Sequence, residues 1–449
     1  MNLMENDMLT IEARVGVKPW KKPLVWGKVW GEGAALFLDI ERMQKTLLYA
    51  FPHRAWDFAR IAAAVYAADR SIPRPPKKGN DAWIRKIHLN FPVKEPDFWN
   101  SPGTSKLMTE ALHFLTGDDW SFEFIAGQRK KTQVYLPFDI REPSKYFLYS
   151  GGLDSAAGLV KYACEHPKES VIPLLIGHRS NMAPKVKSQI DCIRKKFTNV
   201  QKEIVAYFKM NRPDHEERSQ RSRNFLFLVI AGIAAGKREG DSVIVGENGI
   251  GAINLPLSTL MRSTMATRGT HPTFLRMMSD LSSYVLGRCL EYSLPNLHLT
   301  KSELVKVLKD HELEELATST FSCSHPLREK TASQCGQCPA CIFRRHSLWV
   351  AGIAERGERY KHHLFEAESK TITPIASEAL CNFLEMIERV EMSKTEGVMD
   401  WIADHCATTG MVATPEIYDL FGRYRQEWLV FCDAAQKERW PWGHFKMPE

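Results

Sequence analysis

The chain has 449 residues, of which 44% are hydrophobic and 25% are charged. This length predicts two or three domains of about 100–200 residues each, and the composition excludes a disordered or fibrous protein. Its 60 basic and 53 acidic residues give a formal net charge of +7. So small a bias is compatible with an anionic ligand such as ATP, but it does not indicate direct binding of nucleic acid.

Residues 1–15 lack the basic and apolar regions of a secretory signal peptide. The longest apolar run, 225–236, covers 12 residues and is flanked by charges, so a buried helix is expected there instead of a membrane span. We therefore expect a cytoplasmic protein, in which cysteines stay reduced.

The first third of the chain mixes short β-like stretches with a helical pattern. The β-like stretches lie at 24–30 and 34–40, and the helical pattern lies at 57–70. These features predict an N-terminal α+β extension over residues 1–142, which is a candidate partner-binding region.

From residue 143 the pattern changes to apolar strands that alternate with helices. Strands are predicted at 146–150, 170–178, 201–208, 241–248 and 295–300, and helices at 156–165, 184–197, 224–238, 272–287 and 301–311. Strands that are apolar throughout predict a doubly wound parallel sheet covered on both faces. Such a sheet binds ligands beyond the carboxyl ends of its strands. We assign this α/β domain to residues 143–360 and a mainly helical C-terminal region to 361–449.

The first of these strands ends in the sequence SGGLDS, residues 150–155. Gly151 and Gly152 allow a positive φ and close approach of the backbone, and the following helix N-terminus attracts an anion. Ser150 and Ser155 can donate hydroxyl hydrogen bonds to phosphate, while Asp154 can accept from a backbone amide or help to hold Mg²⁺. The Walker lysine is absent. A simple Gly-Gly turn with a capped helix is the alternative.

Four cysteines cluster near the end of the α/β domain: Cys323, Cys335, Cys338 and Cys341. Their spacing is C-x11-C-x2-C-x2-C, and four thiolates suit a structural tetrahedral Zn²⁺ site. An iron–sulfur cluster is an alternative use of four cysteines, and His325 could replace one of them as a ligand.

The SGGLDS loop resembles the PP-loop of ATP pyrophosphatases, and the loop together with the four cysteines resembles the QueC family of 7-cyano-7-deazaguanine synthases. The resemblance implies a PP-loop (HUP-type, Rossmann-like) fold and cleavage of ATP to AMP and pyrophosphate. It implies that a carboxylate is adenylated and then coupled to an amine or ammonia, with ATP, Mg²⁺ and structural Zn²⁺ as cofactors. Ser150, Gly151, Gly152, Asp154 and Ser155 would bind pyrophosphate, with Asp154 and Ser155 also acting in catalysis.

Further family matches follow in chain order. Arg223 and Asn224 match an Arg-Asn helix, and Gly246 and Asn248 match the Gly-x-Asn end of a strand. The resemblance places Asn224, Gly246 and Asn248 at the nucleotide pocket and gives Arg223 a catalytic role, while a surface charge that caps the helix is the alternative for Arg223. His178 follows the second strand and is a candidate contact to adenine or phosphate, with a structural role as its alternative.

The segment after Asn248 departs from the family pattern, which leaves the substrate open. Arg268 and His271 are candidate substrate contacts there, against a simple loop role. The long N-terminal extension and helical tail resemble the QatC proteins of the Qat antiphage defence system. This resemblance implies a protein partner, QatB-like, and allows the carboxylate acceptor to be either a small molecule or a protein.

The leading interpretation is therefore a QueC-like enzyme that adenylates a carboxylate within a defence system. One alternative is a 7-cyano-7-deazaguanine (preQ0) synthase of deazapurine biosynthesis, and an RNA-modifying PP-loop protein is another. A nucleotide-binding assembly subunit without turnover is the alternative from outside the enzymes.

Overall fold

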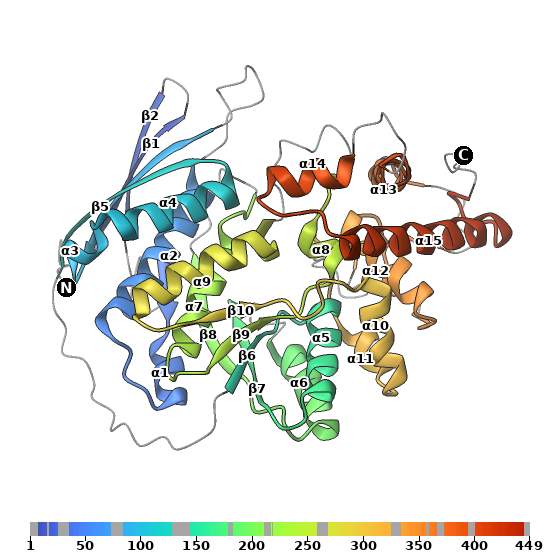
Figure 1. Cartoon of the computed structure of the whole chain (residues 1–449), viewed down its shortest axis with the longest axis horizontal. Helices are drawn as coiled ribbons and strands as arrows, with labels where there is room; N and C mark the ends of the chain where they lie inside the picture. The colour runs from blue at the N-terminus through green and yellow to red at the C-terminus, as the bar shows by residue number, and fades with distance from the viewer. Residues whose placement is uncertain are drawn as a thin grey trace.

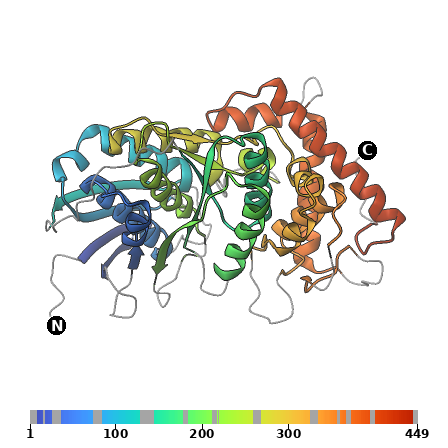
Figure 2. The same ribbon diagram turned by 90° about the horizontal axis from the view of Figure 1, so that it is seen from below.

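The computed structural model describes residues 8–15, 18–25, 36–72, 84–127, 144–177, 183–210, 217, 219–257, 268–324, 334–355, 359–365, 372–393 and 400–443. In Figure 1 the N-terminal part lies on the left, the central sheet in the middle and the C-terminal helices on the right. Figure 2 shows the same order along the long axis from below. The three parts of the chain therefore lie side by side along the molecule.

The strands are β1 (Met8–Val15), β2 (Lys18–Val25), β3 (Leu36–Asp39), β4 (Lys86–Val93), β5 (Asp119–Ala126), β6 (Ser144–Leu148), β7 (Ser170–Ile176), β8 (Ile204–Met210), β9 (Ser242–Val245) and β10 (Glu291–Ser293). The helices up to the cysteine cluster are α1 (Glu41–Leu47), α2 (His53–Ser71), α3 (Pro96–Trp99), α4 (Pro102–Thr116), α5 (Leu153–Glu165), α6 (Ala183–Lys196), α7 (Arg223–Ala235), α8 (Gly249–Ile253), η3 (Arg268–Thr270), α9 (Pro272–Leu286), α10 (Lys301–Asp310) and α11 (Glu314–Ser319). The later helices are α12 (Pro339–Val350), α13 (Pro374–Met392), α14 (Trp401–Thr408) and α15 (Pro415–Lys437).

The central sheet has six strands in the order β10-β9-β6-β7-β8-β3. The five strands from β6 onward are mutually parallel, as the sequence pattern predicts. Their order places the first and fourth strands of the domain side by side, so the chain reverses its winding direction between β6 and β9. Ligands of doubly wound sheets bind at this reversal, outside the carboxyl ends of the strands.

The predicted strand at 295–300 is wrong, because the fifth parallel strand is β10, four residues earlier. Pro295 and Asn296 instead begin a turn that leads to α10, and the Asn296 side chain is buried there. Proline cannot donate to the ladder of a sheet, so it favours the turn over the strand.

Two apolar cores cover the two faces of the central sheet. Val243 and Val245 of β9 pack into the core that contains α7, α9 and α2, whereas Ile244 packs into the core of α5, α6 and α10. This alternation follows from the two-residue period of a strand that is buried on both faces.

The N-terminal part forms a second sheet in the order β2-β1-β4-β5, and its helix α2 packs against α7. The strand β3 also comes from the N-terminal part, but it belongs to the central sheet, where it pairs antiparallel with β8 at the edge. The predicted α+β character of the extension is confirmed, and its side chains share one continuous apolar core with α7 and α9.

A buried charge network fixes this contact. The Arg85 guanidinium lies 2.5 Å from Asp69 of α2 and 2.6 Å from Asp118, and all three side chains are 0% exposed. Asp69 also accepts hydrogen bonds from the backbone N–H and the hydroxyl of Ser222, which precedes α7. The Arg85 charge holds the pKa of Asp69 below its ordinary value, against the opposing effect of burial.

We expect Arg85→Met to lower the free energy of unfolding by about 3–5 kcal/mol, because it leaves two buried carboxylates without their cation. Urea denaturation measures this loss. Arg54→Met is the matched control, since the Arg54–Glu95 pair is 38% and 36% exposed and should contribute at most about 1 kcal/mol. Equal losses in the two variants would contradict the assigned role of the network.

The C-terminal helices α13, α14 and α15 pack with α8 and α12 around an aromatic core. His346 of α12 is buried there and stacks on Trp428 at 4.4 Å, and burial lowers its pKa to about 3. This imidazole is therefore neutral and acts as a core residue. Within the described ranges, each helix is too short or too polar to cross a lipid bilayer.

Candidate functional site

The SGGLDS loop lies at the point where the sheet reverses direction. It connects β6 to α5, and the Gly246–Asn248 segment leaves the neighbouring strand β9. The close packing of these two segments depends on glycine, because a Cβ at Gly158 of α5 would lie 2.8 Å from the Gly246 carbonyl oxygen. The structure therefore brings together two of the sequence motifs that the resemblance selects.

The loop conformation requires glycine at its first turn. Gly151 has a φ of 78°, and an added Cβ would lie 2.7 Å from the Val186 side chain. The Ser155 hydroxyl accepts from the backbone N–H of Ser150 and donates to the carbonyl of Gly152. Ser155 is buried and braces the turn, whereas Ser150 is exposed beside the helix N-terminus.

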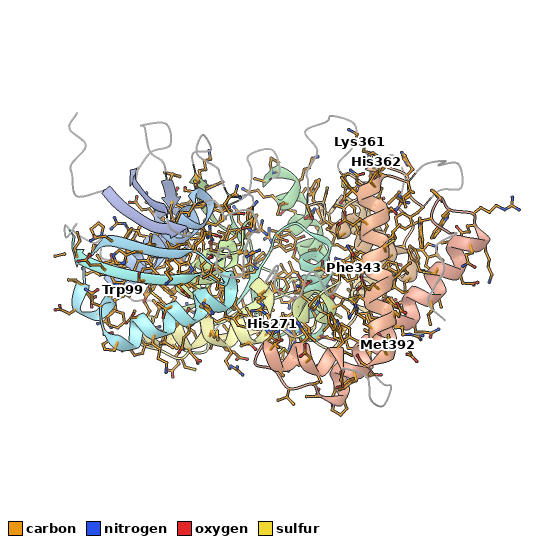
Figure 3. The ribbon with its side chains drawn as sticks, turned by 90° about the horizontal axis from the view of Figure 1, so that it is seen from above. Trp99, His271, Phe343, Lys361, His362 and Met392 are labelled. Carbon is orange, nitrogen blue, oxygen red and sulfur yellow. The ribbon has the colours of Figure 1, made fainter. Side chains whose placement is uncertain are left out.

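Asp154 is the centre of a polar cluster that joins three elements. The Asp154 carboxylate accepts a hydrogen bond of 2.8 Å from the Asn248 side chain. It also forms an ion pair of 2.6 Å with the Lys301 ammonium. The Lys301 side chain is 7% exposed and the Asp154 side chain is 19% exposed. Lys301 also lies over the ring of Phe343, which Figure 3 shows near the centre of the molecule. This cation stands beside the helix N-terminus, where phosphate oxygens are favoured.

Glu247 adds a second carboxyl group to this cluster. The Asn248 side-chain amide donates to both Glu247 and Asp154, at 2.8 Å in each case. Burial and the negative charge of Asp154 raise the pKa of Glu247 to about 8, against the opposing charge of Lys301. One lysine thus faces two carboxyl groups, and the Asp154 carboxylate is suited to help hold a divalent cation.

Sequence reasoning missed Lys301 and Glu247. A signal for Lys301 was present, since Thr300 and Glu303 form a capping box that starts α10 directly after the turn from β10. This start places Lys301 at the same sheet edge as the loop. Lys301 is a cation beside the loop, but unlike a Walker lysine it comes from a distant part of the chain.

The C-terminal helix α15 braces the Lys301 segment. Its Glu427 accepts hydrogen bonds from the hydroxyls of Thr300 and Ser302, at 2.6 and 2.9 Å. Its Arg423 pairs with Glu303 at 2.7 Å. The helical tail therefore positions the residues on either side of Lys301, and a change at Glu427 should reach the loop through them.

Burial raises the pKa of Glu427 to about 7 from its ordinary 4.5, against the two hydroxyl donors. Between about pH 4.5 and 7 the Glu427 carboxyl group is therefore protonated in the folded state but ionised in the unfolded state. This difference stabilises the folded state at low pH, and the stabilisation is lost as pH rises through about 7. We expect Glu427→Gln to reduce the fall in unfolding free energy between about pH 5 and 7.5 by roughly 2–3 kcal/mol. Denaturation of both proteins across this range measures the difference. Parallel pH profiles would contradict it.

The other predicted nucleotide residues lie in different surroundings. Arg223 is exposed, its guanidinium bonds to Gln220, and it lies 5.7 Å from the Phe227 ring. The Asn224 side chain lies against Gly269 of η3, where a Cβ would clash with it. Their roles stay predictions, and His178 lies outside the described residues.

Arg268 and His271 contact the N-terminal part of the chain. The Arg268 guanidinium donates to the carbonyl of Phe114 and lies 4.9 Å from its ring. His271 is 1% exposed and caps α9, because its Nδ1 accepts from the backbone N–H of Thr273 at 3.2 Å. Burial, with smaller contributions from nearby basic groups, lowers the pKa of His271 to about 3.

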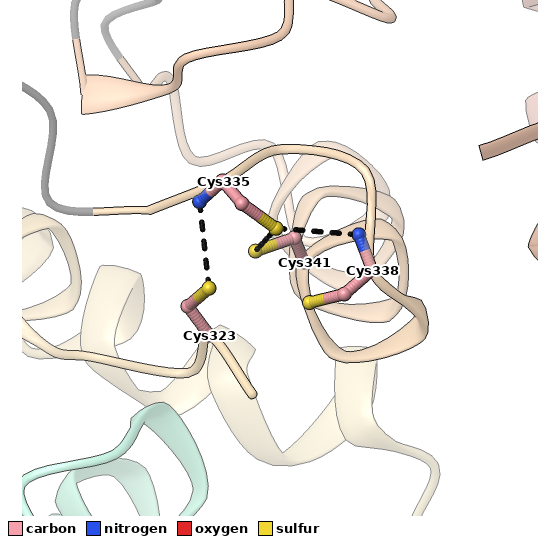
Figure 4. A group of neighbouring side chains, drawn as sticks. All are labelled: Cys323, Cys335, Cys338 and Cys341. Carbon is pink, nitrogen blue, oxygen red and sulfur yellow. Dashed lines mark hydrogen bonds between the residues drawn. The ribbon is translucent and has the colours of Figure 1, made fainter. Parts of the chain in front are cut away.

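The four cysteine sulfurs lie within 4.8 Å of one another (Figure 4). Backbone N–H groups of Cys335 and Cys338 donate to the sulfurs of Cys323 and Cys335, respectively. The turn between them needs Gly336, which has a φ of 83° and would clash with the His362 carbonyl if it had a Cβ.

This arrangement fits one tetrahedral metal ion. Sulfurs about 2.3 Å from a zinc ion would be about 3.8 Å apart. The structure gives 3.8 Å between the sulfurs of Cys335 and Cys341. A four-iron cluster would separate its ligands further, because each sulfur binds a different iron. His325 lies outside the described residues, and zinc is the metal that these four thiols suit.

The cysteine cluster also supports the loop. The segment before Cys323 runs beside it: the Phe321 N–H donates to the Gly151 carbonyl at 3.0 Å. Arg344, on the helix that carries Cys341, donates to the hydroxyl of Thr320 at 2.6 Å. A metal bound to the cysteines would therefore also hold the wall of the loop.

Residues 145–352 match the family model described as "Queuosine biosynthesis protein QueC". The chain carries a QueC-like domain. The chain is 30% identical over 139 residues to the "7-cyano-7-deazaguanine synthase" of Anaeromyxobacter sp. (strain Fw109-5). It is 27% identical over 139 residues to the protein of the same name from Leptospira interrogans serogroup Icterohaemorrhagiae serovar copenhageni (strain Fiocruz L1-130).

These two alignments cover 30% of this chain and 52% and 50% of the relatives, so the chain spans about half the length of the curated relatives it matches. The QueC-like domain contains the loop, the Asp154 cluster and the four cysteines. Glu427 lies outside it, so the brace on Lys301 belongs to the tail of this chain.

Proposed function

We propose that the chain is an ATP-dependent enzyme that adenylates a carboxylate and couples the activated acyl group to an amine. The observation that carries the proposal is the Lys301–Asp154–Asn248 cluster beside the SGGLDS loop, at the reversal point of the sheet. A cation and a helix N-terminus at one position favour the departing pyrophosphate. The QueC family match and the names of the two relatives support this reading.

The first step joins the substrate carboxylate to AMP. A carboxylate oxygen attacks the α-phosphorus of ATP, the bond between that phosphorus and the α,β-bridging oxygen breaks, and pyrophosphate leaves. Backbone amides at 151–155 and Lys301 would receive the pyrophosphate, while Asp154 would help to hold Mg²⁺. The chain contributes positioning and charge stabilisation, so no side chain needs to form a covalent intermediate.

The second step transfers the acyl group. The amine nitrogen attacks the carbonyl carbon, the bond to AMP breaks, and the nitrogen loses a proton. Glu247 is suited to accept that proton, because a carboxyl group with a pKa of about 8 returns it readily near neutral pH. This assignment gives the two carboxyl groups of the cluster different tasks.

We further propose that the reaction serves a bacterial antiphage defence system of the Qat type, with a QatB-like protein as partner and a protein or small-molecule acceptor. The support is the share of the chain outside the family match, residues 1–144 and 353–449, together with the bracing of Lys301 by α15. A preQ0 synthase is the second candidate, favoured by the names of the two relatives.

Release of AMP and pyrophosphate from [α-³²P]ATP tests the proposal. We expect AMP with a suitable carboxylate and ammonia, and none with Asp154→Ala. A nucleotide that binds without AMP formation under all of these conditions would indicate an assembly subunit. Conversion of 7-carboxy-7-deazaguanine to its nitrile would favour the preQ0 synthase, and a partner recovered by pull-down from native cells would favour the defence role.

A further inference from the structure

A cavity of about 840 Å³ lies where the three parts of the chain meet. The residues that matter for its chemistry are Glu110, Phe114, Trp120, Arg268, Trp401 and Asp404. They come from α4 and β5, from η3, and from α14. Figure 3 shows His271 near this junction of α4, α9 and α14.

The cavity wall carries the guanidinium of Arg268. Arg268 pairs with no carboxylate among the residues that the structure describes; its guanidinium contacts only the carbonyl and ring of Phe114. Burial lowers the pKa of Arg268. A half-buried guanidinium in this state favours an anionic ligand that can satisfy its remaining N–H groups.

The ring of His271 lies behind this part of the wall. The His271 ring is neutral and its Nδ1 accepts from Thr273, so the ring proton is on Nε2. This buried Nε2 has no hydrogen-bond partner within the described part of the chain. The ring packs against Phe114 at 5.4 Å and His405 at 6.3 Å, and both of these residues line the cavity. His271 itself is 1% exposed and is not part of the cavity wall, so it supports the lining residues Phe114 and His405 from behind.

The other residues that line the cavity indicate what the rest of the ligand should be like. Phe114, Trp120 and Trp401 give apolar aromatic surface, and the carboxyl groups of Glu110, Asp119 and Asp404 also line the cavity. Ligand sites commonly combine such apolar walls with a few convergent polar groups. No residue that lines the cavity belongs to the SGGLDS loop or to the Asp154 cluster.

We propose that this cavity is a binding site for a small organic acid whose carboxylate pairs with Arg268. Residues outside the QueC-like domain form most of its wall. Arg268 of the QueC-like domain would therefore pair with the carboxylate, while the N-terminal and C-terminal parts of the chain would select the rest of the ligand. Binding at this site does not depend on the proposed adenylation.

Calorimetric titration of the full chain, without ATP, tests the site with two probes of the same shape. Indole-3-acetate carries the carboxylate, and indole-3-acetamide is its neutral counterpart. We expect the acid to bind with a Kd below about 1 mM and at least tenfold more tightly than the amide. Arg268→Met should weaken the acid tenfold or more, whereas Arg276→Met, at an exposed position on α9, should not change its binding.

Melting curves show whether Arg268→Met folds. If it does not, Thr408→Trp carries the test, because Thr408 is exposed at the rim of the cavity and the larger side chain should block entry. The proposal is overturned if acid and amide bind equally, if the acid does not bind, or if binding survives in the informative variant. Since no ATP is present, failure of adenylation leaves these outcomes unaffected.

Discussion

Lys301→Met is expected to reduce AMP release from ATP by about a hundredfold or more, the usual effect of removing one stabilising group for developing charge. The ammonium contacts Asp154 at 2.6 Å, in the first turn of the helix that follows the loop. Its loss also leaves Asp154 beside the phosphates without a counter-charge. Initial rates with [α-³²P]ATP measure the effect.

Lys306→Met is the matched control, because Lys306 is exposed on the same helix and should keep the wild-type rate. Lys301→Arg should restore part of the activity if a positive charge is what the site needs. A rate for Lys301→Met within threefold of wild type, with the melting temperature unchanged, would show that the lysine is not part of the machinery.

Cys338→Ser is expected to abolish stoichiometric metal binding and to lower the melting temperature by roughly 10 °C, because binding energy at a structural site is also folding energy. Purified wild-type protein should contain about one zinc ion per chain. Nucleotide binding should weaken as well, since the Phe321 segment that leads to the cysteines bonds to Gly151. Metal analysis, thermal unfolding and nucleotide titration measure the three effects.

Cys381→Ser serves as the control, because Cys381 is exposed on α13 away from the cluster. It should keep the zinc and the melting temperature of wild type. Removal of the metal from wild type with a chelator should reproduce the effects of Cys338→Ser. A full equivalent of zinc in Cys338→Ser would refute the four-cysteine site, and iron in the wild-type protein would change the metal assigned to it.

The sequence predicted the features that depend on neighbours along the chain. The Gly151–Gly152 turn, the parallel strands and the four cysteines each have a local pattern, and the structure has all of them. The error at 295–300 arose at a proline-containing turn next to a strand of only three residues. Short apolar segments beside a turn carry too little periodicity to separate strand from loop.

The sequence could not predict which distant side chains meet. Lys301 is 147 residues from Asp154, and Glu427 is 127 residues from Thr300. Such contacts depend on how distant elements pack in three dimensions. The periodic pattern of a single sequence shows local elements, but not which of them meet. The same holds for the cavity, because Glu110, Arg268 and Asp404 come from three separate parts of the chain.

The strand β3 has a consequence for how the protein can be divided. It pairs with β8 along four residues and covers the outer edge of the central sheet. A fragment limited to residues 145–352 would leave the N–H and C=O groups of β8 free to pair with another molecule, which promotes aggregation. The N-terminal part therefore also protects the sheet, and intact protein is the form in which its chemistry should be studied.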